Sequence, residues 1–246
     1  MSTAGPTTAM VLAAGLGTRM RPLTDALPKA LIPVAGRALI DRVLDKLRDA
    51  GVTRAVVNVH HFADQVEAHL AGRRDLEILI SDERAGLLDS GGGIQHARHL
   101  LGEAPIFVAN IDSLWLEAGT PALEALKQGW DPARMELLLL LVARGHGIGF
   151  EGPQGFLMDG EGRLTHSASP DVVTPFANVG FGILKPHILD GQKADAFSII
   201  PIWHRLQGEG RLFGVAMDAF WMHVGDPAAR DVAEARLEAG VEARVG

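Results

Sequence analysis

A glycine-rich turn near the start of the chain directly follows an apolar stretch and is rich in positive charge. Gly15 and Gly17 form the turn. Three cations, Arg19, Arg21 and Lys29, come soon after it. Backbone N–H groups that a ligand can approach closely, together with nearby cations, make a binding site for a polyphosphate. The pattern therefore predicts a phosphate-binding turn at the end of a strand.

Two common nucleotide-binding motifs do not account for this turn. A dinucleotide-binding fingerprint needs a third glycine three residues after the second, and Met20 stands there instead. The chain has no Gly-x-x-x-x-Gly-Lys-Ser/Thr motif either, so it is not a P-loop protein. A plain strand-exit turn with solvated arginines would explain Gly15 and Gly17 alone. It does not explain the cations and prolines that continue up to Lys29.

Two later segments carry further groups that could bind a ligand, one after an expected strand and one before an expected helix. Asp112 follows the apolar run 105–110, where it would either bind a ligand or cap the next turn. The segment 89–93, Asp-Ser-Gly-Gly-Gly, opens an expected helix. Its glycines would let backbone groups reach a flat ligand, although alone such a run is only a flexible turn. Both segments are candidates for the same site as the glycine turn.

An alternation of strands and helices in the first half of the chain positions these groups. Hydrophobic spacing predicts strands at 9–14, 54–60, 76–81, 105–110 and 136–143, and helices at 38–50, 62–70, 94–101 and 121–128. This order predicts a Rossmann-like three-layer α/β/α fold with a mixed, mainly parallel central sheet. In such sheets ligands bind beyond the carboxyl ends of the strands, which is where the glycine turn and Asp112 lie.

The second half of the chain loses this alternation. We expect a hairpin at 156–159 and 163–166, strands at 177–184 and 212–217, and helices at 198–207 and 228–239. No linker or internal repeat divides the chain. We therefore expect a single domain over 1–246, in which about 9–143 carry the phosphate turn and about 144–246 add a substrate-facing lobe.

The composition excludes several classes of protein. The chain has 246 residues, of which 47% are hydrophobic, enough for one large core. Its net charge of −7 leaves no overall basic footprint for nucleic acid. The absence of cysteine excludes disulfides and thiolate metal sites, and it fits a cytoplasmic location. No apolar run approaches the roughly 20 residues that span a bilayer, so membrane partners are not expected. The N-terminus has no signal-peptide pattern.

The segments described so far closely resemble the sequence signature of the sugar-1-phosphate nucleotidyltransferases. The similarity covers 12–24, 28–36, 89–94, 108–112 and 221–225, and so extends over nearly the whole chain. The compact length and the Ser-Gly-Gly-Gly loop are most similar to the short bacterial N-acetylmuramate-1-phosphate uridylyltransferases of peptidoglycan recycling. The resemblance implies transfer of a nucleotidyl group from an NTP, with UTP preferred, to a sugar 1-phosphate, and release of pyrophosphate. The first half would then bind the nucleotide, and the second half the sugar.

Other functions stay open on the sequence alone. The enzyme alternatives are guanylyl or cytidylyl transfer to another phosphorylated substrate, such as mannose phosphate, heptose phosphate or phosphocholine. A regulator that binds nucleotide sugars without turnover is a further alternative. The retention of Arg19, Lys29 and Asp112 argues against the regulator, because a sensor needs no arginine for a leaving group. The oligomeric state is open between a monomer and a homodimer.

The resemblance also assigns roles to individual residues. It implies that Arg19, Lys29 and Asp112 are catalytic: Arg19 lies along the β- and γ-phosphates, and Lys29 bridges the α-phosphate and the incoming sugar phosphate. Asp112 would hold Mg²⁺, which needs only one or two carboxylates when phosphate oxygens complete its shell. The residues expected to bind the nucleotide are Leu12, Ala13, Ala14, Gly15, Gly17, Thr18, Arg19, Lys29, Ser90, Gly91, Gly92 and Asn110.

One departure from the family pattern concerns the metal. Relatives usually carry Trp-x-Asp-Val-Gly near the C-terminus, with the Asp as second magnesium ligand, and here His223 takes its place. Imidazole is a poor ligand for Mg²⁺, so His223 would suit a softer metal such as Mn²⁺. Alternatively, Asp226 supplies the missing carboxylate, or Asp112 and the phosphates hold the metal alone. We favour the last two together.

A second departure concerns the sugar. The loop 145–155 lacks the acidic residue that the family pattern places after the fifth strand, and its only acid is Glu151. The sugar can therefore differ from N-acetylmuramate. Asn110, Asn178 and Gly180 are the expected sugar-binding residues. Asn178 is equally well explained as a polar residue at the entry to a strand.

Overall fold

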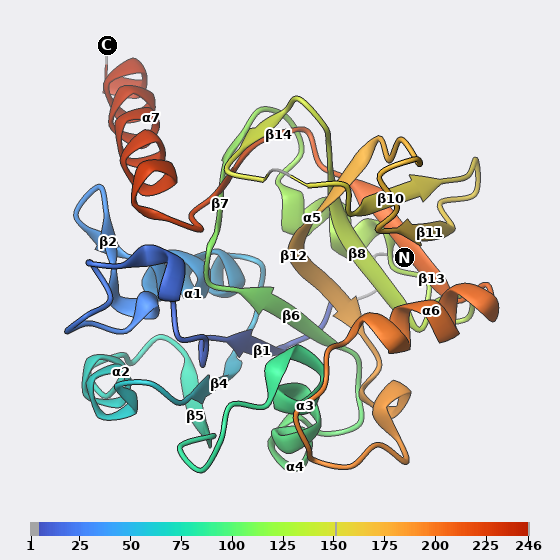
Figure 1. Cartoon of the computed structure of the whole chain (residues 1–246), viewed down its shortest axis with the longest axis horizontal. Coiled ribbons are helices and arrows are strands. Elements are labelled where there is room, and N and C mark those ends of the chain that lie inside the picture. Colours follow the sequence, from blue (N-terminus) through green and yellow to red (C-terminus); the bar gives the residue numbers. More distant parts are fainter. Residues whose placement is uncertain (1–4, 151, 246) are drawn as a thin grey trace.

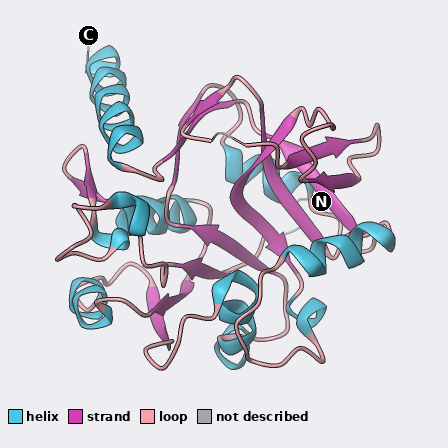
Figure 2. Cartoon of the chain, viewed as in Figure 1, coloured by secondary structure: helices cyan, strands magenta, loops and turns pink. Residues whose placement is uncertain are grey.

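The polypeptide forms a central β-sheet with helices packed on both of its faces (Figure 1). In the computed structural model, residues 5–150 and 152–245 are described. Glu151, the acid of the loop named above, lies outside the described residues. The helices form the outer layers and the strands form the middle layer (Figure 2). The expected α/β/α architecture is therefore confirmed.

Four parallel strands form one half of the sheet. They are β1 (Thr8–Leu12), β4 (Arg54–Val59), β5 (Glu77–Asp82) and β6 (Ile106–Asn110), and they lie side by side in the order β6-β1-β4-β5. Because they are parallel, their carboxyl ends meet at one edge of the sheet. Ala9, Met10 and Val11 of β1 are fully buried, so the strand is covered on both faces.

Five further strands complete the same sheet. β12 (Phe176–Leu184) runs antiparallel to β6 on one side and to β8 (Leu137–Ala143) on the other. β13 (Leu212–Ala216) pairs with β8, while β10 (Gly155–Met158) and β11 (Leu164–Ser167) form the expected hairpin beside β12. The two halves of the chain thus share one sheet, which is mixed as predicted. The single-domain assignment stays a prediction.

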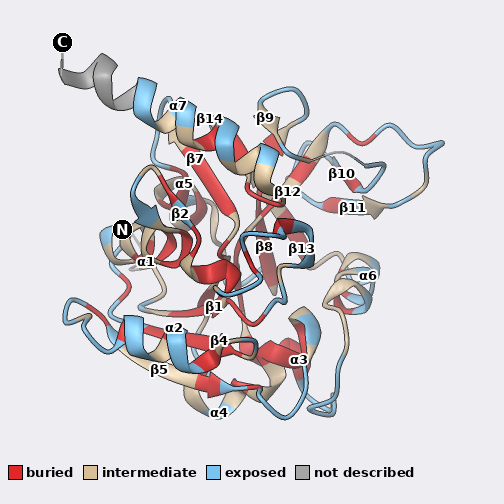
Figure 3. Cartoon of the chain, turned by 60° about the vertical axis from the view of Figure 1, so that its left-hand side comes forward, coloured by how far each residue is buried: buried red, intermediate tan, exposed pale blue. Residues whose placement is uncertain are grey.

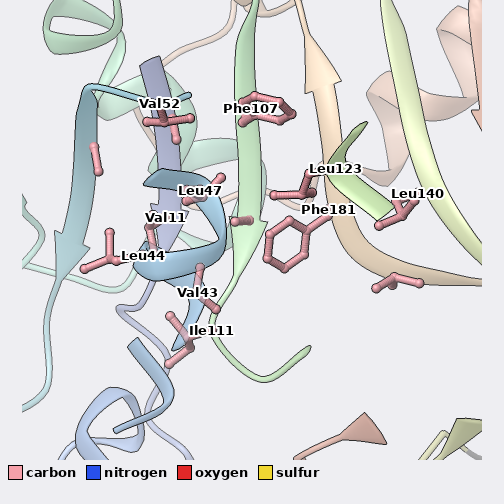
Figure 4. Packing of buried hydrophobic residues seen from close by; sticks show 14 of the residues in the cluster. Val11, Val43, Leu44, Leu47, Val52, Phe107, Ile111, Leu123, Leu140 and Phe181 are labelled. Atoms are coloured by element: carbon pink, nitrogen blue, oxygen red, sulfur yellow. The ribbon is translucent and has the colours of Figure 1, made fainter. Parts of the chain in front are cut away.

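The helices bury alternate residues of the strands in two separate cores. Along β1, Val11 packs with one core and Met10 with the other, because successive side chains of a strand point to opposite faces. Figure 4 shows the core around Val11, and Figure 3 shows the sheet as a buried layer between partly exposed helices. The helices over Val11 are α1 (Leu39–Asp49), α2 (Ala63–Leu70) and α5 (Ala122–Gly129); those over Met10 are α3 (Asp89–His96), α4 (Arg98–Leu101) and α6 (Ile200–Gly208).

A small second sheet brings the C-terminal part of the chain back toward the first half. Its strands are β7 (Ser113–Glu117), β14 (Ala219–His223) and β9 (Gly147–Ile148). In the β7–β14 register, His223 stands opposite Ser113, the residue after Asp112. The sequence patterns predicted none of these three strands. The remaining short elements are the hairpin of β2 (Pro33–Val34) and β3 (Arg37–Ala38) and the 3₁₀ turns Thr18–Met20, Lys29–Leu31 and Pro186–Leu189.

Two elements expected in the first half of the chain have other boundaries in the structure. β1 ends at Leu12 rather than at residue 14, because the N–H groups of Ala13 and Ala14 donate to the side chain of Asn58. A single helix over 94–101 is also wrong, since α3 begins earlier, at Asp89, and α4 is separate. The glycine run therefore lies inside α3 rather than before it.

The C-terminal helix α7 (Pro227–Val245) begins close to its expected start and runs beyond its expected end at residue 239. In Figure 1 it extends away from the sheet. Of the helices in the described part of the chain, α7 included, none has the length and apolar character needed to cross a membrane.

Candidate active site

A cavity of about 550 Å³ opens at the carboxyl edge of the parallel strands. Its walls come from the glycine turn after β1, from the ends of β4 and β6, and from the start of α3. Most residues expected to bind a nucleotide or to act in catalysis line it: Leu12, Ala14, Gly15, Gly17, Thr18, Arg19, Lys29, Ser90, Asn110 and Asp112. The structure thus brings together the glycine turn and Asp112, which the sequence placed at two separate strand ends.

The glycine turn is shaped by its contact with Lys29. Gly17 has a φ of 63°, in the left-handed region, and a Cβ there would lie 3.0 Å from both Lys29 Cβ and Thr24 Cγ2. The Thr24 hydroxyl donates to the Gly17 carbonyl at 2.9 Å and fixes the turn. Met20, which breaks the dinucleotide fingerprint, is fully buried. Only glycine allows both this backbone conformation and the close approach to Lys29.

Lys29, Asp112 and His223 meet beside the turn. Lys29 is buried, and its Nζ donates to Asp112 Oδ2 at 2.7 Å. His223 Nε2 lies 3.4 Å from the same oxygen. His223 Nδ1 donates to the Gly149 carbonyl at 2.9 Å, which fixes the orientation of the ring. Three distant parts of the chain therefore converge on one carboxylate.

The charges of this cluster shift the ionisation of its members. Burial opposes the ionised form of Asp112, but the hydrogen bond with His223 and the charge of Lys29 outweigh it and hold the pKa of Asp112 well below its usual range. Burial also opposes a charged His223. Its hydrogen bond to Asp112 outweighs that effect and raises the pKa of His223 above the ordinary value. The site is thus a carboxylate between two groups that can carry positive charge.

The raised pKa of His223 predicts a pH-dependent contribution to stability in the ligand-free protein. A folded-state pKa above the unfolded value of about 6.5 gives stability that is full below that pH and is lost as the pH rises through the folded-state pKa. The variant His223→Gln lacks this contribution. We therefore expect wild type to exceed His223→Gln in free energy of unfolding by more at about pH 6 than at about pH 9. Urea unfolding at both pH values measures this, and an equal difference at the two would contradict it.

Asp226 has a structural partner of its own. Asp226 is the N-cap of α7, and its Oδ1 accepts the Ala229 N–H at 2.8 Å. Asp226 does not line the cavity. Among the described residues, no group of three His, Asp or Glu side chains is arranged to hold a metal ion. In the described ranges 5–150 and 152–245, Asp112 is the one carboxylate that pairs with His223. This donor set fits a divalent ion that ligand phosphates hold in large part.

The wall of the cavity also carries apolar side chains from the glycine turn and from the loop before α3. Leu16 and Leu87 are exposed apolar side chains on its walls, and Ser90 lines it too. Gly91 and Gly92 do not line it. A Cβ on Gly91 would lie 2.4 Å from the ring of Phe197, and the Gly92 N–H donates to the Phe197 carbonyl at 3.0 Å. These glycines let α3 pack against the segment before α6, and their expected contact with a nucleotide stays a prediction.

A second cavity of about 190 Å³ adjoins the first and shares Leu12, Ser90 and Asn110 with it. Asn178 and Gly180 line it, so the three expected sugar-binding residues come together. Gly180 has a φ of 81°, and a Cβ there would lie 2.7 Å from Asn110 Nδ2. The Gly180 N–H donates to Asn178 Oδ1 at 2.9 Å. A bulge in β12 between Asn178 and Gly182 therefore makes room for Asn110 at the junction of the two cavities.

Sequence reasoning missed several residues of the larger cavity. Asn58, Glu83 and Gly225 line it, together with Leu16, Leu87, Asp89 and Ile111. Asn58 lies inside an apolar strand, and a polar residue in a buried run is the signal that points to it. Glu83 follows β5 just as Asp112 follows β6, and both lie at the same edge of the sheet. Their similar positions are the signal that points to Glu83. Gly225 gave no signal beyond its place in the C-terminal motif.

A glycine turn, a lysine and a carboxylate lie together at the carboxyl edge of a three-layer α/β sheet, the place where such sheets bind their ligands. Residues 9–144 match the family model of the MobA-like NTP transferase domain, and the chain belongs to this family of nucleotidyltransferases. It is 50% identical to an N-acetylmuramate alpha-1-phosphate uridylyltransferase of Caulobacter vibrioides, over 94% of this chain and 97% of that protein. It is 34% identical to the protein of the same name from Neisseria meningitidis, over 88% and 92%.

Solved structures show the same fold at lower identity. The inositol-1-phosphate CTP transferase of T. maritima superimposes with a TM-score of 0.76 at 18% identity, over 95% of this chain and 96% of that one. A putative glucose-1-phosphate thymidylyltransferase of Bacillus anthracis has a TM-score of 0.77 at 16% identity, over 93% and 94%. The architecture is thus shared by proteins named for different bases and different phosphorylated substrates.

Proposed function

We propose that this enzyme transfers the uridylyl group of UTP to N-acetylmuramate 1-phosphate and releases pyrophosphate. The observation that carries the proposal is the 50% identity to the Caulobacter vibrioides uridylyltransferase along nearly the full length of both chains. The geometry agrees with it. Two adjoining cavities meet at Asn110, and Lys29 and Asp112 line the larger one close to that junction. A triphosphate in the larger cavity and a sugar in the smaller one would bring their phosphates together there.

The chemistry needs positioning and charge compensation rather than covalent help from the protein. An oxygen of the sugar phosphate attacks the α-phosphorus, a new P–O bond forms, and the bond to the bridging oxygen breaks in line. Pyrophosphate leaves with the electron pair, and no proton has to move. Lys29 would lie between the α-phosphate and the incoming phosphate. Its ammonium group would compensate the charge that spreads over the phosphate oxygens.

A divalent cation fits the same place. We propose that Asp112 holds it and that triphosphate oxygens supply the other ligands, as suits Mg²⁺. His223 orients the Asp112 carboxylate and would favour Mn²⁺ over Mg²⁺ if it became a ligand itself. When bound, the ion would neutralise charge on the triphosphate. The cytoplasmic location stays a prediction, and the oligomeric state stays open between a monomer and a homodimer.

Turnover with a panel of substrates tests the proposal. Purified enzyme is mixed with UTP, dTTP, GTP or CTP and with N-acetylmuramate, N-acetylglucosamine, glucose or mannose 1-phosphate, and pyrophosphate release is measured. We expect the highest kcat/KM for UTP with N-acetylmuramate 1-phosphate. A higher value for another pair would replace the named substrates. No turnover with any pair, alongside tight nucleotide binding, would favour the regulator.

Arg19 should matter for turnover far more than its neighbour Arg21. Arg19 lines the cavity, whereas Arg21 is exposed, does not line it and pairs with Asp25 at 3.5 Å. We expect Arg19→Ala to lower kcat/KM by about 10²-fold, because the fork of an arginine suits the β- and γ-phosphates and the leaving pyrophosphate. Arg21→Ala is the matched control and should stay close to wild type. Equal losses in the two variants would show only a general effect of surface charge.

A further inference from the structure

A buried amide and carboxylate lie side by side beneath the nucleotide cavity. Asn58, in β4, and Glu83, just after β5, are each 2% exposed. Asn58 Nδ2 donates to Glu83 Oε1 at 2.7 Å. Both residues also line the larger cavity. Two neighbouring parallel strands thus end in one hydrogen-bonded pair.

The pair links two loops that border the cavity. On one side, Asn58 Oδ1 accepts the N–H groups of Ala13 and Ala14, at 2.6 Å and 3.2 Å, directly before the glycine turn. On the other side, Glu83 Oε2 accepts the Leu88 N–H at 3.3 Å, directly before Asp89 and the start of α3. All polar atoms of the two side chains, except one amide hydrogen, therefore form hydrogen bonds. These bonds connect the two loops through the pair.

The carboxylate is costly to bury, which argues for a specific role. Both Glu83 oxygens act as acceptors, as an ionised carboxylate does. In the described part of the chain no salt bridge involves Glu83, since the adjacent Arg84 pairs with Asp64, Glu67 and Asp82 instead. A buried charge without a countercharge is unfavourable unless hydrogen bonds compensate it. A simple apolar pair would serve packing better at these two positions.

The main chain and α3 hold the pair in place. The Glu83 N–H donates to the Val59 carbonyl at 2.8 Å, and His60 Nδ1 donates to the Glu83 carbonyl at 2.7 Å. In α3, Gly93 packs directly on the pair. A Cβ there would lie 2.8 Å from Glu83 Oε1 and 2.9 Å from Asn58 Nδ2. The Glu83 carboxylate and the Asn58 amide therefore have little freedom to rearrange.

We infer that Asn58 and Glu83 are positioning residues for the nucleotide, which set the distance between the phosphate turn and the loop that leads into α3. The inference rests on the proposed function only in that UTP is the nucleotide tested. It predicts that breaking the pair weakens binding of the nucleotide far more than binding of the sugar phosphate, because neither Asn58 nor Glu83 lines the smaller cavity.

An exchange of the two side chains gives a sharp test. In the double variant Asn58→Asp with Glu83→Gln, the aspartate can still accept from Ala13 and Ala14, and the glutamine can donate to it and accept from Leu88. All four hydrogen bonds and the net charge are kept. Either single variant loses at least one bond. In Asn58→Asp, two carboxylates face each other and neither can donate. In Glu83→Gln, the side-chain oxygen accepts from Asn58, so the NH₂ group faces the Leu88 N–H, which then has no acceptor. We expect each single variant to raise the Kd and the KM for UTP about tenfold, as loss of a buried hydrogen bond does, and the double variant to recover most of it.

Val57→Ala in the same strand is the matched control for stability. Val57 is fully buried and does not line the cavity. At an equal loss in Tm, Val57→Ala should leave the KM for UTP unchanged, and the single variants of the pair should leave the KM for the sugar phosphate within about twofold of wild type.

Two outcomes would overturn the inference. One is a double variant whose Kd for UTP is as high as that of the more impaired single variant. The other is a Val57→Ala variant that raises the KM for UTP as much as the single variants of the pair do. If neither single variant folds, a folded double variant with a near-native Kd for UTP supports the pair, and an unfolded one refutes it. Because UTP binding is measured directly, failure of wild type to use N-acetylmuramate 1-phosphate would refute the proposed function alone.

Discussion

Replacing Lys29 by cysteine is expected to lower kcat/KM for nucleotidyl transfer by roughly 10²- to 10³-fold, the cost of removing one preorganised donor to developing charge. Lys29 is buried at the edge of the cavity, and its Nζ already bonds Asp112 at 2.7 Å. Its ammonium group is therefore held in place, and under the proposed function the α-phosphate and the incoming phosphate meet beside it. We expect most of the loss in kcat, since the lysine should stabilise the transition state more than the bound substrates.

The chain allows this loss to be reversed chemically. It contains no cysteine, so the thiol introduced at position 29 is unique. Alkylation with 2-bromoethylamine rebuilds an ammonium group at nearly the native length, whereas iodoacetamide adds a neutral amide of similar size. We expect activity to return with the first reagent and not with the second. Recovery with both reagents, or a loss of only a few-fold in Lys29→Cys, would show that the charge at this position does not drive the reaction.

The parts of the fold that the sequence predicts are those in which local pattern and final contacts coincide. The glycine turn and its cations lie within one short segment, so spacing alone predicted a phosphate site. The strands β1, β4, β5, β6 and β8 are apolar runs, and the helices between them have an apolar face. Their alternation dictates a sheet covered on both sides. The order of strands along the sheet then fixes which strand ends share an edge, and Asp112 joined the turn for that reason.

The remaining parts depend on contacts between distant segments, which no local pattern reveals. β7 and β14 are short, and only their pairing brings His223 next to Asp112. The glycine run of α3 suggested a contact with a flat ligand, but Gly91 is required by its contact with Phe197, far along the chain, and Gly93 by its contact with Asn58 and Glu83. Asn58 and Glu83 acquire their role only once β4 and β5 lie side by side. Sequence therefore predicted the reaction class better than the supporting side chains.

Replacing Asp112 by asparagine should affect metal binding and turnover together. The variant keeps an oxygen that can accept from Lys29, so the fold of the site is largely preserved, but it loses the negative charge that a divalent cation requires. We expect kcat/KM to fall by about 10²-fold or more, the scale of losing a metal-assisted step. In the presence of UTP, we expect the Kd for Mn²⁺ to rise about tenfold or more, as electron paramagnetic resonance of the free ion would report.

Asp226→Asn is the matched control, because it makes the same chemical change three residues after His223. Asp226 caps α7 through the Ala229 N–H, and asparagine caps a helix about as well as aspartate. We therefore expect its Mn²⁺ affinity and its turnover to stay close to wild type. If Asp226→Asn weakened Mn²⁺ binding as strongly as Asp112→Asn, Asp226 would be a ligand in the working enzyme and α7 would have to change its first turn. If Asp112→Asn instead lost turnover with unchanged Mn²⁺ affinity, the carboxylate would serve to hold Lys29 in place rather than to bind the metal.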